Sequence, residues 1–331
     1  MARMTTSRDV ARLARVSQST VSRVLSGKGN VRQETSERVM TAAQRLGYYV
    51  NETARSMKTK KSKSIGVVLP SLLNPFFSET AHSVYTYTKE HDRTMLIELT
   101  MDNPRAHQAV VKDLIGRRVE GLLLGAVSTG DTFMEEYCQH PVVPSVMYNR
   151  RLSKDIGNWV VSDNKLGSIM ATTYLLTQGH RDILYVSGDM AYSTAVDRLM
   201  GYKFAMDNAG KKPRVVCGNY DYVQTFEVVG NVLDAEHFRQ PTAIFAGNDL
   251  MALAVIGALT NRNLGPKSDI AVIGFDNISW PARRDINLTT ISQRQDLMLK
   301  TALEGLFDLI NGRTHTVRTV IKPELIIRGT A

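Results

Sequence analysis

Four short loops of this sequence carry side chains that could bind the hydroxyl groups of a small molecule. Each loop follows an apolar run or ends one, and combines amides or charged groups with aromatic rings. Amides and carboxylates exchange hydrogen bonds with hydroxyls, and an aromatic face covers the apolar face of a sugar ring. The loops are residues 70–77 (PSLLNPFF), 148–150 (YNR), 245–249 (FAGND) and 274–277 (GFDN).

A different chemistry is indicated near the amino terminus, where three short helices are expected. The first covers residues 7–14, the second follows a Ser17 cap and ends before Gly27, and the third lies around residues 39–46. Their apolar stripes are Val10, Leu13 and Ala14, then Val21, Val24 and Leu25, then Val39, Ala42, Ala43 and Leu46. Helices joined by so short a turn cross steeply, which frees the outward face of the second one to enter a major groove. That face carries Gln18, Ser19, Ser22 and Arg23.

Positive charge is concentrated in the same segment. The 331-residue chain has a formal net charge of +9, from 41 Lys and Arg and 32 Asp and Glu. Residues 1–63 hold 14 of the basic and 4 of the acidic residues, a net charge of +10, which leaves the other 268 residues at −1. A basic unit attached to a neutral one is typical of proteins that bind a polyanion. We therefore expect nucleic acid as the partner of this amino-terminal segment, which we call the head.

Motifs of other functional classes are missing from the sequence. It has no GxGxxG or Walker sequence for a nucleotide cofactor, and no GxSxG or paired-carboxylate motif for catalysis. The seven His lack metal-ligand spacing, and Cys138 and Cys217 indicate reduced structural thiols. No apolar run approaches the roughly 18 residues of a membrane span, and residues 1–10 lack a secretory signal. We expect no enzyme activity, cofactor, metal site or membrane association, and a cytoplasmic location.

The head closely resembles the LacI/GalR family of bacterial transcription regulators. The motifs that carry the resemblance are Asp9-Val10-Ala11, Val16-Ser17, Thr20-Val21-Ser22-Arg23-Val24-Leu25 and Leu46-Gly47-Tyr48. The resemblance implies that Gln18 and Ser19 read base edges and that Arg23 also faces the groove. It places three hydroxyl side chains near phosphates: Ser17, Thr20 and Ser22. The alternative for Thr20 and Ser22 is that they are ordinary solvent-facing helix residues.

Residues 51–63 are expected to form a hinge helix and linker. A helix of about eight residues is marginal in water, so this segment should order only when a partner stabilises it. In the resembling family, paired hinge helices of a dimer enter the minor groove of the DNA, and an apolar side chain opens a base step. The resemblance implies Asn51, Ala54 and Met57 as DNA-binding residues, with Met57 in the place of a usual Leu.

Three residues of the head depart from the family pattern. Arg15 stands in the turn where Gly is common, which predicts a left-handed backbone that costs a non-glycine residue about 1 kcal/mol. Arg32 replaces the usual Ser cap of the third helix, and we expect it to contact a DNA phosphate instead. Val50 stands where Pro is common, which predicts a looser entry to the hinge.

From residue 64 onward, short apolar strands alternate with amphipathic helices. This alternation predicts an α/β domain with parallel sheets, whose ligands bind at the carboxyl ends of the strands. The seven expected strands are residues 65–69, 95–99, 121–124, 145–148, 183–186, 243–246 and 271–275.

This part also resembles the family, and the resemblance implies a two-lobed, periplasmic-binding-protein-like effector domain. The expected organisation is a helix-turn-helix domain over 1–50, the hinge over 51–63 and the effector and dimerisation domain over 64–331. The chain should cross three times between lobe one (about 64–162 and 292–321) and lobe two (about 163–291 and 322–331). By position, the implied effector-holding residues are Arg198, Asn248 and Asp276, and the implied cleft-lining residues are Phe76, Tyr148, Asn149 and Tyr220. The alternative for Asn248 and Asp249 is that they cap the following helix.

The expected protein is a sequence-specific regulator, a repressor controlled by a sugar or sugar derivative. Two-fold operators need two-fold proteins, which predicts a homodimer built through the large domain. Whether the effector acts as inducer or corepressor stays open, as do the sugar and the operator sequence. The rival class is a cytoplasmic sugar-binding or sugar-processing α/β protein whose basic head serves another partner. Full biological function after deletion of residues 1–63 would favour that rival.

Overall fold

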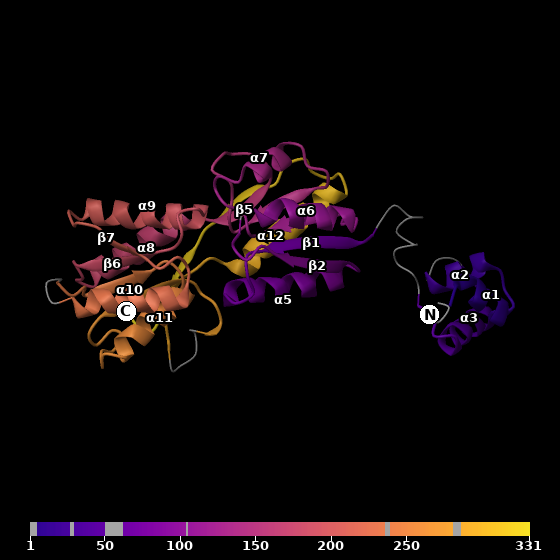
Figure 1. Ribbon diagram of the computed structural model, residues 1–331, viewed down its shortest axis with the longest axis horizontal. Coiled ribbons are helices and arrows are strands. Elements are labelled where there is room, and N and C mark those ends of the chain that lie inside the picture. Colours follow the sequence, from indigo (N-terminus) through magenta and orange to yellow (C-terminus); the bar gives the residue numbers. More distant parts are fainter. Residues whose placement is uncertain (1–4, 27–29, 50–61, 104, 236–238, 281–285) are drawn as a thin grey trace. The chain divides into compact units, whose positions relative to one another are not determined.

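The computed structural model of this chain describes residues 5–26, 30–49, 62–103, 105–235, 239–280 and 286–331. The chain divides into two compact units, residues 1–62 and 63–331 (Figure 1). The predicted hinge contacts Asn51, Ala54 and Met57 lie outside the described residues, as does Val50 before them.

Three short helices close around a small apolar core in the first unit: α1 (Ser7–Ala14), α2 (Gln18–Leu25) and α3 (Gln33–Arg45). Helix α1 begins after Thr6 because the Asp9 carboxylate accepts hydrogen bonds from the backbone N–H and the hydroxyl of Thr6, at 3.0 and 2.7 Å. The predicted Ser17 cap of α2 is confirmed by the hydrogen bond that its Oγ accepts from the Thr20 amide. The buried core consists of Val10, Ala11, Ala14, Val21, Val39, Ala42 and Ala43.

Two residues of α1 and its C-terminal turn test the sequence predictions. Arg15 follows α1 with φ 53° and ψ 47°, so the predicted left-handed backbone is confirmed. Leu13 is 49% exposed, so its predicted place in the apolar stripe is wrong. Helices α2 and α3 cover the side of α1 that carries Val10, Ala11 and Ala14, and this narrow core does not extend to Leu13.

The second unit contains two six-stranded sheets, and each sheet forms the centre of one lobe (Figure 1). In lobe one the strand order is β11-β5-β4-β3-β1-β2 and every pair is parallel. Its strands are β1 (Ser64–Leu69), β2 (Thr94–Leu99), β3 (Gly121–Leu124), β4 (Ser145–Tyr148), β5 (Trp159–Ser162) and β11 (Arg318–Ile321).

In lobe two the strand order is β12-β10-β9-β8-β6-β7, parallel except for β12, which runs antiparallel to β10. Its strands are β6 (Ile183–Ser187), β7 (Arg214–Cys217), β8 (Ala243–Ala246), β9 (Ala271–Asp276), β10 (Thr289–Ser292) and β12 (Glu324–Ile326). The predicted parallel-sheet fold and all seven predicted strands are confirmed.

Helices cover both faces of each sheet because alternate strand residues are buried on opposite sides. In lobe one, Val67 packs with α5 (Pro75–Glu90) and α12 (Gln295–Ile310), whereas Val68 packs with α6 (Ala106–Gly116) and α7 (Thr132–Gln139). In lobe two, Tyr185 packs with α8 (Asn164–Thr177) and α9 (Ser193–Asn208), whereas Leu184 packs with α10 (Tyr222–Asp234) and α11 (Asp249–Thr260).

The chain passes between the lobes three times, from β5 to α8, from β10 to α12 and from β11 to β12. Two of these crossings are joined by a hydrogen bond of 2.9 Å from the Asp163 amide to the Ile321 carbonyl. Each crossing leaves the carboxyl end of a strand, so the carboxyl edges of both sheets lie where the lobes meet. This is the edge at which open α/β sheets bind ligands.

Helices α8 and α9 approach so closely that a glycine is required between them. A Cβ at Gly201 of α9 would lie 2.3 Å from the Lys165 carbonyl oxygen and 2.7 Å from the Ser168 Cβ, both on α8. A backbone oxygen cannot move aside as a flexible side chain can, so any larger residue must separate the two helices.

We expect Gly201→Ala to lower the free energy of unfolding of the second unit by about 1–3 kcal/mol, because it overpacks this contact. The matched control is Gly116→Ala in α6, where a Cβ meets nothing within 4 Å. This substitution should raise the free energy of unfolding of the second unit by about 0.5–1 kcal/mol. Urea unfolding followed by tryptophan fluorescence measures both, because Trp159 and Trp280, the two tryptophans of the chain, belong to this unit. Equal stability of the two variants would contradict the requirement.

Candidate ligand pocket and nucleic-acid interface

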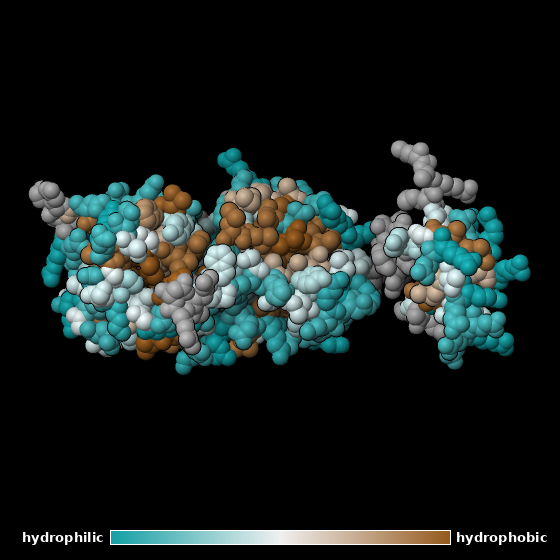
Figure 2. All heavy atoms as spheres, turned by 90° about the horizontal axis from the view of Figure 1, so that it is seen from below, coloured by the Kyte–Doolittle hydropathy of each residue, from teal (hydrophilic) through white to brown (hydrophobic). Residues whose placement is uncertain are grey.

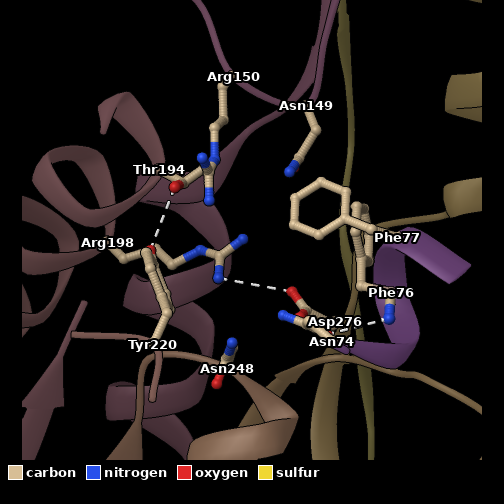
Figure 3. Close-up of a pocket in the computed structure, with 10 residues that line it drawn as sticks. All are labelled: Asn74, Phe76, Phe77, Asn149, Arg150, Thr194, Arg198, Tyr220, Asn248 and Asp276. Atoms are coloured by element: carbon tan, nitrogen blue, oxygen red, sulfur yellow. Dashed lines mark hydrogen bonds and ion pairs between the residues drawn. The ribbon is translucent and has the colours of Figure 1, made fainter. Parts of the chain in front are cut away.

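A pocket lies between the lobes of the second unit, at the carboxyl ends of the strands (Figure 3). Lobe one contributes residues that follow β1 and β4, and lobe two contributes residues from α9 and from the ends of β7, β8 and β9. The lining residues are Asn74, Phe76, Phe77, Asn149 and Arg150 of lobe one, and Thr194, Arg198, Tyr220, Asn248 and Asp276 of lobe two.

A buried arginine lies at the centre of the lobe-two wall. Arg198 is 2% exposed, and its guanidinium packs over the Phe275 ring at 3.7 Å from the ring centroid. Its Nε donates to Asn164 Oδ1 at 2.8 Å and its Nη1 donates to the Gly247 carbonyl at 2.5 Å. The same Nη1 lies 3.5 Å from Asp276 Oδ1 (Figure 3). These contacts fix the guanidinium with one edge toward the pocket.

Asp276 is the acidic group of the pocket. Its Oδ1 accepts a hydrogen bond of 2.7 Å from Gln293 Nε2, and Gln293 belongs to the β10–α12 crossing. Burial raises the pKa of Asp276 to about 7, although the nearby Arg198 acts in the opposite direction. Asp249, on α11, is also fully buried, and its desolvation raises its pKa to about 6. Both carboxyl groups therefore bind their protons more tightly in the folded chain than in the unfolded chain, where a carboxyl group titrates near pH 4.

Aromatic rings form the apolar part of the wall. Phe76 and Phe77 meet edge to face at 5.2 Å between centroids. Across the pocket, the Tyr220 hydroxyl hydrogen-bonds the Thr194 hydroxyl at 3.1 Å (Figure 3). The ring of Tyr220 fits there because Gly188 has no side chain: a Cβ at Gly188 would lie 2.2 Å from it.

Three amide side chains belong to the polar lining: Asn74, Asn149 and Asn248. Asn149 is buried, and its Oδ1 has no hydrogen-bond partner among the described residues. Asn248 lines the pocket and also caps α11, through the hydrogen bond that its Oδ1 accepts from the Met251 amide at 2.8 Å. The capping alternative is confirmed for Asn248. It is wrong for Asp249, whose carboxylate instead accepts from the Ile278 amide and the Thr290 hydroxyl.

The structure brings together six of the seven side chains predicted for the effector site: Phe76, Asn149, Arg198, Tyr220, Asn248 and Asp276. Tyr148 does not line the pocket, because its side chain is fully buried behind Phe76, with the two rings stacked at 6.3 Å. Sequence reasoning missed four lining residues. Asn74, Phe77 and Arg150 belong to loops that had been singled out, whereas Thr194 is the second residue of a helix and carries no motif.

The helix-turn-helix of the first unit presents the residues expected to bind DNA. Ser17, Gln18, Ser19, Ser22 and Arg23 are exposed, and Thr20 is half-buried. The Ser17 hydroxyl hydrogen-bonds those of Ser19 and Thr20, at 2.7 and 2.8 Å, and Gln18 Nε2 donates to Ser7 Oγ at 2.8 Å. These contacts hold the hydroxyl groups together at the N-terminus of α2, where the helix dipole favours a phosphate.

Arg32 stands at the N-cap of α3, as predicted, and its side chain makes no capping hydrogen bond. It is exposed, so it is available to another partner.

The described part of the chain has no group of three or more His, Cys, Asp or Glu side chains that could hold a metal ion. No described helix is long and apolar enough to cross a membrane.

Comparison with known proteins identifies the family. Residues 6–51 match the bacterial regulatory proteins of the lacI family, and residues 172–331 match the periplasmic binding protein-like domain. The HTH-type transcriptional repressor PurR of Vibrio campbellii is 31% identical over 99% of this chain and 98% of its own length. The ribose operon repressor of Escherichia coli K12 is 32% identical over 99% of this chain and 100% of its own length. This chain belongs to the LacI family.

Solved structures of LacI-family proteins have the same fold. The Lac repressor dimer bound to operator and the anti-inducer ONPF gives a TM-score of 0.87 at 26% identity, over 99% of both chains. The complex of the transcriptional regulator CelR with cellobiose gives a TM-score of 0.72 at 27% identity, over 99% of this chain and 100% of the other. The expected family, the helical head and the two-lobed domain are thereby confirmed.

The raised pKa of Asp276 makes a prediction about pH. The folded state binds this proton up to about pH 7 and the unfolded state only to about pH 4, so the group favours folding at low pH and that contribution is lost as the pH rises through 7. Asp276→Asn, which cannot ionise, should therefore gain stability relative to the wild type between pH 5 and pH 8. Urea unfolding followed by tryptophan fluorescence at both pH values measures the difference. A constant difference would show that Asp276 does not titrate in this range.

Proposed function

We propose that this LacI-family protein is a transcriptional repressor whose operator affinity is controlled by a sugar or sugar derivative. The observation that carries the effector proposal is the pocket itself. It joins two guanidinium groups, a carboxyl group and three amides to aromatic rings, which is the donor, acceptor and apolar set that a sugar ring uses.

The relatives support both halves of this proposal. The curated relatives are repressors, one of them of the ribose operon, and CelR was solved with cellobiose. The Lac repressor was solved as a dimer on its operator. We assign the same kind of partner to this chain, operator DNA read by the α2 face, and no catalytic role. A regulator of this kind acts in the cytoplasm, where bacterial DNA is.

A homodimer formed through the second unit is part of the proposal. Figure 2 shows broad hydrophobic areas on both lobes of that unit. Large apolar side chains exposed on the second unit include Leu73 at 85%, Val223 at 61% and Trp280 at 61%. Exposed apolar area of this kind is common where subunits associate, and a two-fold dimer matches a two-fold operator.

The effector is identified by a thermal-shift screen of monosaccharides, sugar acids, polyols and nucleobases, repeated with operator DNA. A sugar that binds the folded state raises the melting temperature of the second unit. Asp276→Asn should reduce the affinity for that sugar about 10-fold or more, because it replaces a charge-assisted hydrogen bond by a neutral one. The control is Lys300→Ala, on the exposed part of α12. An unchanged affinity in Asp276→Asn would show that this residue does not bind the sugar. If none of the sugars raises the melting temperature, the proposed effector class is refuted.

The DNA interface is tested by two substitutions that should act differently. Gln18→Ala should lower the affinity for an operator selected from random duplexes about 10-fold and leave non-specific binding unchanged, because it removes a base contact. Arg32→Ser should weaken binding to all duplexes and lower the salt slope by about one, because it removes a phosphate contact.

Binding titrations of the selected operator and of a non-specific duplex, at salt concentrations from about 50 to about 200 mM, separate the two effects. Arg32→Ser also supplies α3 with a capping hydroxyl, so loss of binding cannot be attributed to a weaker helix. An unchanged salt slope would show that Arg32 does not contact a phosphate.

A further inference from the structure

The start of α9 attaches lobe two to lobe one at the edge of the pocket. The backbone N–H and the hydroxyl of Thr129, in lobe one, both donate to the Ala191 carbonyl, at 2.8 and 3.0 Å. The Arg151 amide, also in lobe one, donates to Ser193 Oγ at 3.0 Å. Tyr192 lies between these two contacts in the sequence, and Thr194 directly after them lines the pocket.

Tyr192 makes the most extensive of these contacts. It is 5% exposed, and its hydroxyl donates to Asp102 Oδ1 at 2.9 Å. Arg150 Nη1 donates to the same oxygen at 3.0 Å, and the Arg150 guanidinium covers the Tyr192 ring at 3.7 Å from the centroid. Asp102 and Arg150 belong to lobe one and Tyr192 to lobe two, so each of the three side chains contacts the other two across or beside the cleft.

The loop that presents Asp102 has an unusual backbone. It follows β2, and both Met101 and Asp102 have a φ of 53°. Two successive residues with side chains in the left-handed region are unfavourable, and they persist only where surrounding contacts determine the conformation. The contacts made by the Asp102 side chain are the hydrogen bonds from Arg150 and Tyr192. The strained backbone and the interlobe contact therefore depend on each other.

Arg150 also connects this group to the pocket. Its guanidinium points into the pocket from lobe one, above Arg198 and beside Thr194 and Asn149 (Figure 3). Its side chain is 5% exposed and lies 5.4 Å from the Phe77 ring centroid, while the Asp102 side chain is 49% exposed. One face of the arginine thus belongs to the pocket wall, and its partner carboxylate lies toward the outside.

We propose that Asp102 and Tyr192 are positioning residues that form, with Arg150, an interlobe clasp: it keeps the cleft closed in the absence of effector and fixes Arg150 in the pocket wall. The clasp rests on these contacts alone, whereas its influence on sugar affinity rests on the function proposed above. Opening the cleft must break the Tyr192–Asp102 hydrogen bond and uncover the Tyr192 ring. Because the clasp already holds the lobes together, less of the binding free energy of the effector goes into closing the cleft.

Hydrogen exchange of the full-length protein without any sugar tests the clasp. The amides of Thr129 and Arg151 donate across the cleft, so they exchange when the lobes separate. Tyr192→Phe keeps the ring and removes one hydrogen bond to a charged group, which should speed exchange at both amides about 10-fold. Asp102→Asn, whose amide oxygen is a weaker acceptor for the tyrosine hydroxyl than the carboxylate, should also speed this exchange, and the double variant should be no faster than Tyr192→Phe alone, because that variant already lacks the shared hydrogen bond.

The matched control is Tyr137→Phe, which removes a hydrogen bond of 3.1 Å to the Val143 carbonyl within lobe one. It should leave the exchange of Thr129 and Arg151 unchanged, and exchange at the core strand residue Val67 should stay slow in every variant. The clasp is refuted if Tyr192→Phe and Asp102→Asn speed the two amides no more than Tyr137→Phe does, or if their effects simply add. Since no sugar is present, either result leaves the proposed effector function standing, and a sugar screen without a hit leaves the clasp standing.

Discussion

The ion pair between Arg198 and Asp276 is the interaction around which the pocket is built. Both side chains are almost fully buried, and a charge taken out of water must be compensated by partners close at hand. Those partners come from distant parts of the chain: Asn164 from α8, the Gly247 carbonyl after β8 and Gln293 from the β10–α12 crossing. The pair therefore forms only when the whole of lobe two and one of the crossings are in place.

The same crossing connects this pair to the opposite wall of the pocket. Gln293 donates to Asp276 in lobe two, and two residues later Gln295 donates to the Phe76 carbonyl and the Thr80 hydroxyl in lobe one, at 2.7 and 2.8 Å. Movement of one wall relative to the other must stretch one of these bonds. A ligand that draws the walls together thus acts directly on the β10–α12 crossing between the lobes. Through this crossing, lobe closure can change the arrangement of the subunits in an assembly.

The sequence predicted the fold where its signal was local, and failed where side chains of distant elements decide. The seven predicted strands are largely apolar, but β7 and β11 are edge strands of alternating burial, and β10 buries Thr289 and Thr290 instead of aliphatic residues. The family resemblance implies a cleft-lining position for Tyr148. It is the last residue of β4, however, and successive residues of a strand point to opposite faces, so Tyr148 enters the core where Asn149 enters the pocket. Thr194 reaches the pocket only because α9 is held against lobe one.

Three of the residues that line the pocket share an unusual backbone conformation. Asn149, Tyr220 and Asp276 all have positive φ angles, of 67°, 59° and 129°, in a region that favours glycine. Asn tolerates this region well, whereas Tyr does not. The space for the Tyr220 ring is supplied by Gly188, which lies on a different loop. The space that the Tyr220 ring needs is thus provided by a residue far from it in the sequence, and only the folded chain brings the two together. Asn149, Tyr220 and Asp276 therefore combine a strained backbone with contacts inside the pocket, and neither property can be read from a single loop of the sequence.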